Sequence, residues 1–308
     1  MDFQIAETDA GITVGAFLKL RLSLSSKMLK YLKYREDGIL LNGERVTVRK
    51  VLRTGDLLVL ATCDSSDQAL LEPVDLDLPI LFEDADLVVP NKPPRMPTHP
   101  SHDHYRDTVA NALAFRYREM GVPFVFRPVN RLDRDTSGLL LIARNKLAAG
   151  RMTAAMQEGK IRKTYLAVLQ GDSLPAAGRI EAPLHRTAQS IIVREVCSPN
   201  APDAEPAATD YRVLARAGGC SLVAARPLTG RTHQLRVHFA SLGHPILADD
   251  LYGTEDDRIG RQALHAYRLT FPHPTTGEEL TLTAPLPADL SGLVDALFPQ
   301  FEIPQFLF

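Results

Sequence analysis

The chain has 308 residues, of which 45% are hydrophobic and 23% are charged, and its formal net charge is −2. This length predicts two domains, or one large domain with an appendage, and the apolar runs fall far short of the roughly 20 residues that span a bilayer, which argues against a transmembrane helix. Three cysteines without a CxxC pair argue against a disulfide framework or a cysteine-rich zinc site, and the acidic N-terminus lacks a secretory or transit signal, so we expect a cytoplasmic protein.

The N-terminal part of the chain is basic. Residues 19–53 carry ten basic side chains against three acidic ones. In the segment SSKMLKYLKYRED, lysines at every third position predict a helix with Lys27, Lys30 and Lys33 along one side, although such a run can also be an ordinary solvated face. The next segment, GILLNGERVTV, predicts two short strands joined at the Asn-Gly dipeptide, because both residues tolerate positive φ. The run GDLLVL then predicts a closing strand.

A change in character divides the chain. The stretch TCDSSDQALLEPVDLDL is acidic, contains a proline and has no periodicity, so we place a linker at residues 63–78 between domains of residues 1–62 and 79–308. The second domain has many strand-like runs and fewer helices. The helices that we expect there span about residues 107–120, 146–158, 232–242 and 288–298. Because regular βαβ alternation is missing, we predict an α+β fold with a large mixed, mainly antiparallel sheet.

The stretch RLDRDTSG, residues 131–138, concentrates charge directly before the apolar run LLLIA. Asp133 is therefore expected on a loop or turn held against a buried strand, which is a rigid scaffold for presenting a carboxylate. The alternative is that Asp133 and Asp135 are turn-forming residues whose oxygens cap nearby N–H groups.

A second charged stretch is expected to bring polar side chains to this carboxylate. The segment RPLTGRTHQLRVHFASLGHPILADDLYG holds three arginines and three histidines within about twenty residues, and a helix from about Thr232 would place His233 and Arg236 on one side. Arg231 precedes this helix and is suited to hold a carboxylate, with Asp133 as a candidate, through two parallel hydrogen bonds.

Strand alternation in IRKTYLAVLQG puts Tyr165 on the same face as Lys163. A single tyrosine in a strand is usually a packing residue. Beside a nucleophilic carboxylate, however, it can stack on a base or move a proton.

These blocks, together with ILFEDADLVVPNKPPRMPTHP and LHAYRL, resemble the RluA family of pseudouridine synthases, in family order across about residues 79–285. The RLDxxTSG and TGRTHQLRxH blocks are highly specific as a pair. Residues 12–62 resemble the small αL-type RNA-binding domain first described in a ribosomal small-subunit protein (the S-four type). The resemblance implies a pseudouridine synthase catalytic domain of residues 79–308 preceded by that RNA-binding domain.

The family isomerises uridine in RNA to pseudouridine without a cofactor or metal. By this resemblance Asp133 is the catalytic carboxylate, which either attacks the anomeric carbon or assists removal of the 2′-hydrogen. Arg231 would pair with Asp133, and Tyr165 would pack on the target base and can shuttle the proton. Arg131 would enter the space that the flipped nucleotide leaves.

The sequence departs from the family at two points. Asn130 stands where the residue before the RLD motif is usually His, and Arg95 replaces the glycine of a KPxG motif. We expect both to alter loop support or RNA contact rather than chemistry. The RNA-contact residues that we predict are Arg131, Asn130, Lys27, Lys30, Lys33, Arg95, His233 and Arg236.

Competing interpretations remain at this point. The segment THPSHDHYRD, with three histidines and an aspartate, matches no HExxH spacing and favours a surface or RNA-facing loop over a metal site. We predict a monomeric pseudouridine synthase whose partner is large-subunit ribosomal RNA, with transfer RNA as the alternative. A non-catalytic RNA-binding or ribosome-assembly factor is a second class, and a glycosidase or nucleosidase, with Asp135 as its second acid, is a third.

Overall fold

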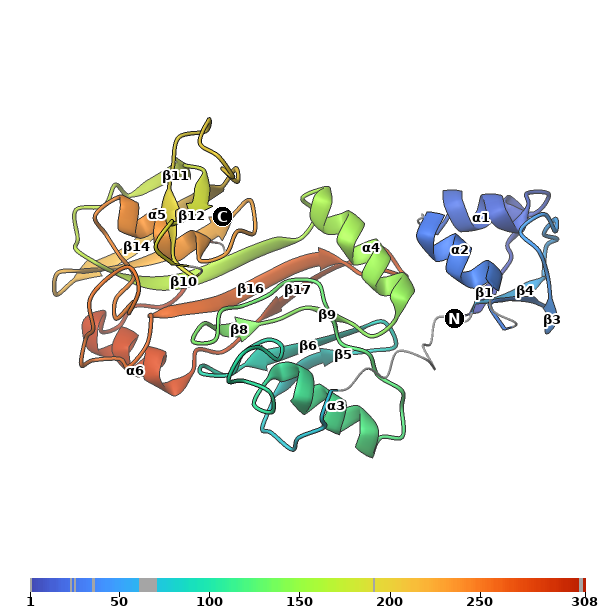
Figure 1. Ribbon diagram of the computed structural model, residues 1–308, viewed down its shortest axis with the longest axis horizontal. Coiled ribbons are helices and arrows are strands. Elements are labelled where there is room, and N and C mark those ends of the chain that lie inside the picture. Colours follow the sequence, from blue (N-terminus) through green and yellow to red (C-terminus); the bar gives the residue numbers. More distant parts are fainter. Residues whose placement is uncertain are drawn as a thin grey trace.

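A computed structural model describes residues 2–22, 24, 26–34, 37–60, 71–190, 192–304 and 307–308, and within residues 26–34 it leaves the side chains at 26–28 and 31 undescribed. Figure 1 shows a small N-terminal unit, in blue, and a larger part built on a long twisted sheet. Within these ranges, no helix combines the length and the apolar character needed to cross a membrane.

The N-terminal unit is a four-stranded antiparallel sheet with two helices. Its helices are α1 (Val14–Leu20) and α2 (Ser26–Tyr34), and its strand order is β1 (Asp2–Gln4), β4 (Leu57–Leu60), β2 (Ile39–Leu41) and β3 (Glu44–Arg45). Asn42 and Gly43 join β2 to β3 with φ angles of 51° and 85°, which confirms the predicted tight turn. Helix α2 confirms the predicted helix, and Lys30 and Lys33 are exposed on it. The side chain of Lys27 lies outside the described residues.

The larger part is built on an eleven-stranded sheet. Its main strand order is β11 (Ala177–Glu181), β14 (Ala208–Ala217), β15 (Cys220–Pro227), β10 (Arg162–Gln170), β16 (Leu264–Pro272), β8 (Ser137–Leu139), β6 (Leu87–Lys92), β9 (Ile142–Ala143) and β7 (Arg127–Pro128), with β17 (Glu279–Thr283) beside β16 and β5 (Ile80–Glu83) beside β6. A separate hairpin pairs β12 (Leu184–Arg186) with β13 (Arg194–Val196). The β8–β16 pair is parallel and the other recorded pairs in the large sheet are antiparallel, so the predicted mixed, mainly antiparallel sheet is confirmed.

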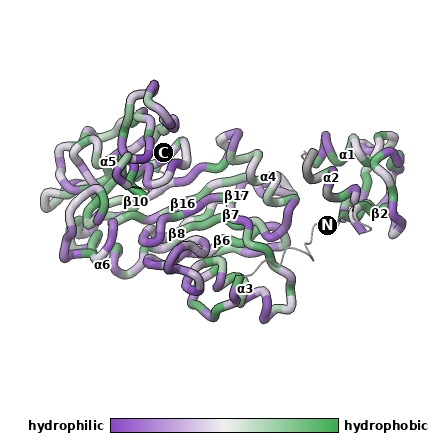
Figure 2. The backbone as a smooth tube through the Cα atoms, in the orientation of Figure 1, coloured by the Kyte–Doolittle hydropathy of each residue, from purple (hydrophilic) through white to green (hydrophobic). Residues whose placement is uncertain are grey.

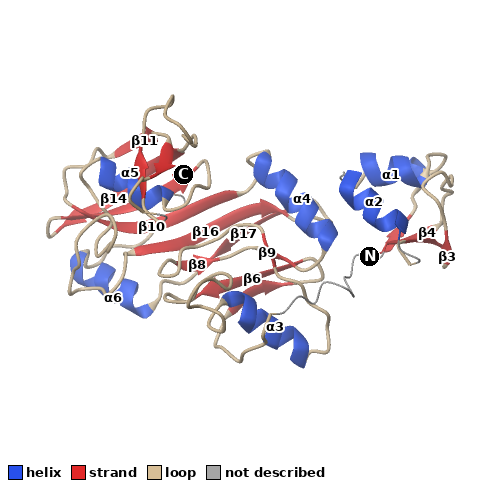
Figure 3. Cartoon of the chain, in the orientation of Figure 1, coloured by secondary structure: helices blue, strands red, loops and turns tan. Residues whose placement is uncertain are grey.

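The four helices expected in this part all form, as Figure 3 shows. They are α3 (Val109–Glu119), α4 (Lys146–Gln157), α5 (Gln234–Ser241) and α6 (Ala288–Leu297), so each predicted boundary is within two residues. Local chemistry sets these limits. The side chains of Thr108 and Asn145 accept backbone N–H groups at the starts of α3 and α4, and Gly159 and Gly243 adopt positive φ just after α4 and α5.

Both faces of the large sheet are covered. Alternate residues of β6 enter different clusters, since Val88 packs in a core with α3, α5 and α6, whereas Leu87 and Val89 pack in a second core with α4. The tube in Figure 2 accordingly shows hydrophobic residues along the central strands. A sheet buried on both faces is a rigid support for loops at its strand ends.

The run LLLIA after the polar stretch is buried, as predicted, but it is divided between β8 and β9. Gly138 in β8 has φ of 111°, and a Cβ built on it would lie 2.3 Å from the carbonyl oxygen of Ala266 in β16. This close approach requires glycine. The glycine thus allows β8 to pair closely with β16 just after the loop that carries Asp133.

The domain limits stay predictions. The first half of the predicted linker and the boundary at residue 62 fall within residues 61–70, which lie outside the described ranges. In its second half, the Glu72 carbonyl accepts the Asn111 side-chain amide at 2.7 Å and the Val74 N–H donates to the Asn111 carbonyl at 3.2 Å. Residues 72–74 therefore lie against the start of α3 rather than free of the larger part.

Candidate active site

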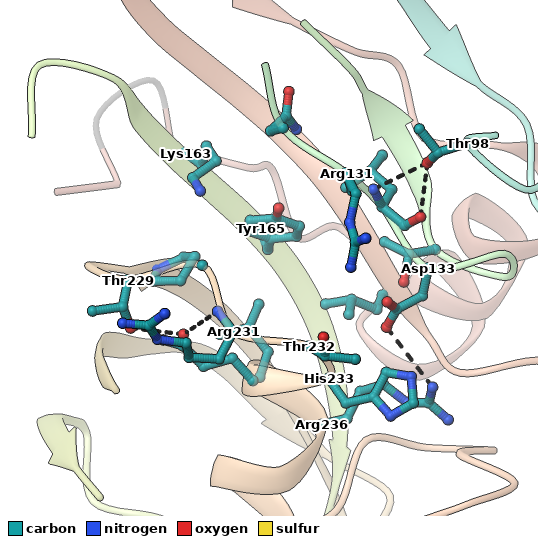
Figure 4. Close-up of a pocket in the computed structure, with 18 of the residues that line it drawn as sticks. Thr98, Arg131, Asp133, Lys163, Tyr165, Thr229, Arg231, Thr232, His233 and Arg236 are labelled. Carbon is teal, nitrogen blue, oxygen red and sulfur yellow. Dashed lines mark hydrogen bonds and ion pairs between the residues drawn. The ribbon is translucent and has the colours of Figure 1, made fainter. Parts of the chain in front are cut away.

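The predicted blocks meet in one cleft of about 1120 Å³. The loop before β8, strand β10, the loop after β15 and the start of α5 line it, and Figure 4 shows their side chains around a common space. The residues of interest on its walls are Asn130, Arg131, Asp133, Lys163, Tyr165, Arg231, His233 and Arg236. Segments that are about 100 positions apart in the sequence thus form a single site.

Buried side chains hold the loop that carries Asp133 through hydrogen bonds to its backbone. The Thr98 hydroxyl donates to the Leu132 carbonyl at 2.9 Å and accepts the Leu132 N–H at 3.2 Å. Lys92 is fully buried, and its ammonium donates to three backbone carbonyls, including that of Arg134 at 2.8 Å. Burial lowers the pKa of Lys92 to about 7, an effect that the charge of Asp135 opposes. In its charged form, Lys92 donates one hydrogen to each of the three carbonyls and so holds the backbone of the loop in place.

Asp133 faces a buried guanidinium. Its Oδ2 lies 3.8 Å from Nη1 of Arg236, and its side chain is 30% exposed. Arg236 also makes two hydrogen bonds of 2.7 Å to Asp249, whose side chain is fully buried, and one of 2.9 Å to Asp250. Asp249 therefore fixes the orientation of Arg236, and Arg236 presents positive charge to the carboxylate of Asp133.

The prediction that Arg231 pairs with Asp133 is wrong. Arg231 instead donates to the Glu205 carboxylate at 3.1 Å and to the Pro206 carbonyl at 3.0 Å. Helix α5 starts at Gln234, so Arg231 lies in the loop before it, and its guanidinium turns toward the 205–206 segment rather than toward Asp133. The prediction that Arg236 contacts RNA also conflicts with the structure, because Arg236 is only 4% exposed and is paired with acids.

Tyr165 and Lys163 both line the cleft from β10, which confirms that they share a face. Tyr165 is 8% exposed. Burial raises the pKa of its phenol well above the usual range, and the negative charge of Asp133 raises it further. The phenol is therefore protonated at neutral pH and presents a flat ring with one O–H donor to the cleft.

The predicted RNA-contact residues around the loop differ in their surroundings. Arg131 is exposed on the cleft wall. Asn130 is buried, and its side-chain oxygen accepts the Leu141 N–H at 2.8 Å, while its Nδ2 has no partner among the described residues. His233 adopts a left-handed φ of 56° and contacts the Tyr252 hydroxyl at 2.8 Å, and burial lowers its pKa. Their contacts with RNA stay predictions.

Arg95 does not line the cleft. It adopts the positive φ of 65° that glycine would occupy more easily, and its guanidinium lies beside Gly260, 3.2 Å from the position of a Cβ there. Its contact with RNA also stays a prediction.

The histidine-rich segment is divided among separate partners. His102 contacts Asp103 at 2.8 Å and His104 contacts Asp107 at 2.6 Å. In the described part of the chain, no group of three or more His, Cys, Asp or Glu residues is arranged to hold a metal ion. His99 and His104 belong to the cleft lining, in agreement with the RNA-facing interpretation.

Asp135 is not placed as a second acid. It pairs with Arg134 at 2.8 Å and does not belong to the cleft lining. A glycosidase or nucleosidase mechanism with Asp133 and Asp135 as its two carboxyl groups therefore lacks the required geometry.

Several site residues were missed in the sequence. Asp249 and Tyr252 lie in the segment ADDLYG, where a doublet of acids after a histidine- and arginine-rich block was a usable signal for an ion pair. Lys92 is the lysine of the KPP segment. Its place at the end of the apolar run of β6 was a signal that its charge is buried and needs polar partners. Thr98 had no local signal, because its hydrogen bonds to Leu132 span 34 positions.

The family profile described as RNA pseudouridylate synthase matches residues 86–241. The chain is 40% identical over 275 residues to the Uncharacterized RNA pseudouridine synthase YjbO of Bacillus subtilis (strain 168), covering 89% of this chain and 95% of the relative. It is 36% identical to the Ribosomal large subunit pseudouridine synthase D of Vibrio cholerae serotype O1, covering 85% of this chain and 84% of that protein.

Solved structures agree with this match. The structure of Human RNA Pseudouridylate Synthase Domain Containing 1 aligns with a TM-score of 0.57 and 32% identity, covering 68% of this chain and 84% of that one. Human RNA Pseudouridylate Synthase Domain Containing 4 aligns with a TM-score of 0.58 and 25% identity over 73% of this chain and 94% of that one. With the cleft, the blocks that build it and these similarities together, the chain belongs to the RluA family of RNA pseudouridine synthases.

Proposed function

We propose that this protein isomerises a uridine of large-subunit ribosomal RNA to pseudouridine, with Asp133 as the catalytic carboxylate. The observation that carries the proposal is the position of Asp133. Its carboxylate is held on a fastened loop, 3.8 Å from the buried Arg236 guanidinium, in a cleft that also exposes the ring of Tyr165. No second carboxylate among the described residues lines this cleft.

One carboxylate is sufficient for the chemistry. The target nucleotide leaves its stack and enters the cleft, which costs a few kcal/mol. Breaking the bond between uracil and ribose develops positive charge on the sugar, which the Asp133 carboxylate stabilises or traps. The uracil leaves as an anion with its charge on N1, turns and rejoins the sugar through carbon 5, which breaks any bond that Asp133 had made to the sugar. Carbon 5 then loses its hydrogen to solvent as a proton, and N1 takes up a proton.

Two neighbours support that carboxylate. Asp249 accepts hydrogen bonds from two nitrogens of Arg236 and so fixes its orientation. Arg236 can therefore orient the Asp133 carboxylate without itself turning toward the substrate. Tyr165 offers an apolar ring on which the base can stack, and its phenol stays uncharged beside Asp133. The site therefore places the charged group at the sugar and the flat group at the base.

The ribosomal substrate rests on two observations. This chain matches 84% of the length of a relative that bears the name Ribosomal large subunit pseudouridine synthase D. The N-terminal unit adds a basic segment, residues 19–53, that suits a long RNA better than a mononucleotide. A ribosomal substrate implies action in the cytoplasm, and we propose that the protein acts there as a monomer.

The test is release of tritium from carbon 5 of labelled uridine in unmodified large-subunit ribosomal RNA, small-subunit ribosomal RNA and transfer RNA, each supplied separately. We expect release from the large-subunit RNA, and a loss of about three orders of magnitude or more in Asp133→Asn, which keeps size and removes charge. The matched control is Asp135→Asn, since Asp135 lies outside the cleft and should leave turnover nearly unchanged. Normal turnover in Asp133→Asn would contradict the assignment, and release from transfer RNA alone would replace the substrate.

A further inference from the structure

Lys163 is a cation in the cleft that lacks an acidic partner. It lies on β10 with its side chain half-buried, and no acidic residue in the described part of the chain pairs with its ammonium. Its Nζ is near Gly230, 3.7 Å from the position of a Cβ there. The neighbouring cations differ, because Arg162 pairs with Glu279 at 2.9 Å and Lys160 pairs with Glu158 at 2.6 Å.

An unpaired and partly buried ammonium raises the free energy of the RNA-free protein. Burial lowers the pKa of Lys163, and no negative charge offsets this effect. An anion bound in the cleft would restore the lost solvation. The side chain is therefore better suited to an anionic ligand than to stabilising the empty protein.

The position of Lys163 shows which anion it can meet. In Figure 4, the ring of Tyr165 lies between Lys163 and Asp133. Lys163 is thus removed from the bond that breaks at the ribose, and its ligand is a permanent charge of the RNA rather than one that develops during the reaction.

The spacing on the strand agrees with a phosphate. Lys163 and Tyr165 are two residues apart on one face of β10, which separates them by roughly 6.6 Å along the strand. This is comparable with the step from a nucleoside to a phosphate that flanks it. With its base on Tyr165 and its ribose at Asp133, the target keeps its flanking phosphates at the open side of the cleft, where the flexible and partly exposed Lys163 can reach one of them.

We propose that Lys163 binds the phosphodiester next to the target uridine and so positions the flipped nucleotide against Tyr165 and Asp133. This inference rests on the proposed function, and it assigns a role to a residue that the chemistry itself does not use. Lys163 is a positioning residue, since it contacts the RNA chain away from the reacting atoms. Its removal should weaken substrate binding while leaving the chemical step largely intact.

The experiment uses the full chain and a short transcript that spans the uridine mapped by tritium release. Lys163→Met should raise KM by about tenfold with kcat changed by less than about twofold, and Lys163→Arg should restore most of the loss because it keeps the charge. The matched control is Lys160→Met, an exposed and paired lysine on the approach to the same strand, which should leave KM unchanged. Equal loss in Lys163→Met and Lys163→Arg would overturn the proposal, because it would indicate packing.

Neutral phosphates sharpen the result. Two further transcripts each carry one uncharged methylphosphonate, on the 5′ or the 3′ side of the target. One of them should raise KM for the wild type by about the same factor as Lys163→Met, and should add no further increase in Lys163→Met. Multiplication of the two effects for both transcripts would overturn the proposal.

Failure of the proposed function has a separate signature. In that case the wild-type protein releases no tritium from any RNA, and binding is measured instead. The variant Lys163→Met should then reduce the slope of log affinity against log salt concentration for the unmodified large-subunit transcript by about 0.7 to 0.9, the value for one phosphate contact. An unchanged slope, or an absence of RNA binding by the wild type, would overturn the role of Lys163 as well.

Discussion

Arg236 and Arg231 lie five positions apart in one block of sequence and both line the cleft, but their side chains pair with different acids. We call Asp133, Arg236 and Asp249 the floor, where charges are buried or half-buried and compensate one another at short distances. We call Arg131, Lys163 and Arg231 the rim, where cations are partly or fully exposed. The floor has the pre-organised geometry that chemistry requires, whereas the rim has positive charge available to a polyanion.

This difference has a physical cause. A buried charge that loses its partner is strongly destabilising, so the floor can tolerate little change. An exposed ion pair contributes little, so Arg231 can exchange its pairing with Glu205 for a phosphate at low cost, and Lys163 has no acidic partner among the described residues to give up. Substitutions that move charge in each region therefore separate the two roles.

The largest effect is expected from Asp249→Asn. It keeps the size of the side chain but removes the fully buried carboxylate that pairs with the buried Arg236, so the free energy of unfolding should fall by about 3 to 5 kcal/mol. Turnover should fall by about 10- to 100-fold, because Arg236 loses its fixed orientation beside Asp133. Urea unfolding and tritium release measure the two effects.

The matched control for this change is Asp250→Asn. Asp250 contacts the same guanidinium at 2.9 Å, but its side chain is 62% exposed. Its removal should cost less than about 1 kcal/mol. Equal effects in the two variants would contradict the view that the buried partner of Arg236 matters more than the exposed one.

A smaller effect is expected from pH. His265 is fully buried under the loop, contacts the Ser137 hydroxyl at 2.9 Å, and has its pKa lowered by burial to about 4. The unfolded chain binds a proton at this histidine near pH 6.5, and the folded protein does so only near pH 4, so stability falls as the pH decreases between these values. Lowering the pH from 7 to 5 should cost about 2 kcal/mol through this group.

Urea unfolding at pH 7 and pH 5 checks this prediction. His265→Gln should be less stable at pH 7, because the buried site is altered, but it should lose less stability than the wild type on going to pH 5. An equal loss in both proteins would assign the pH dependence to other groups.

The smallest effect is expected from Arg231→Ala. Its ion pair with Glu205 at 3.1 Å is partly exposed, so unfolding should change by less than about 1 kcal/mol, and kcat should stay close to that of the wild type. Arg236→Ala provides the contrast, with a large loss of both stability and turnover. If Arg231→Ala were the more damaging variant in tritium release, the pairing with Asp133 would have to form in the RNA complex.

The sequence predicted local structure well, because local structure follows from neighbouring residues. Lysine and leucine periodicity predicted α2, the Asn-Gly dipeptide predicted the β2–β3 turn, and glycines marked the ends of α4 and α5. The block RLDRDTSG predicted a carboxylate presented by a loop on a buried strand. These features depend on helical period, positive φ and alternation, all of which can be read within a few positions.

The ion-pair partners were decided by the tertiary structure alone. Arg231 and Arg236 are chemically identical and both lie near the start of α5, but Asp249 and Asp133 lie 13 and 103 positions from Arg236. Which guanidinium faces Asp133 depends on where α5 begins and on which side of it the buried Asp249 lies. The motifs thus predicted the family and its chemistry. The pairing of charged side chains in the site depended on contacts between segments that are distant in sequence, which the sequence alone does not show.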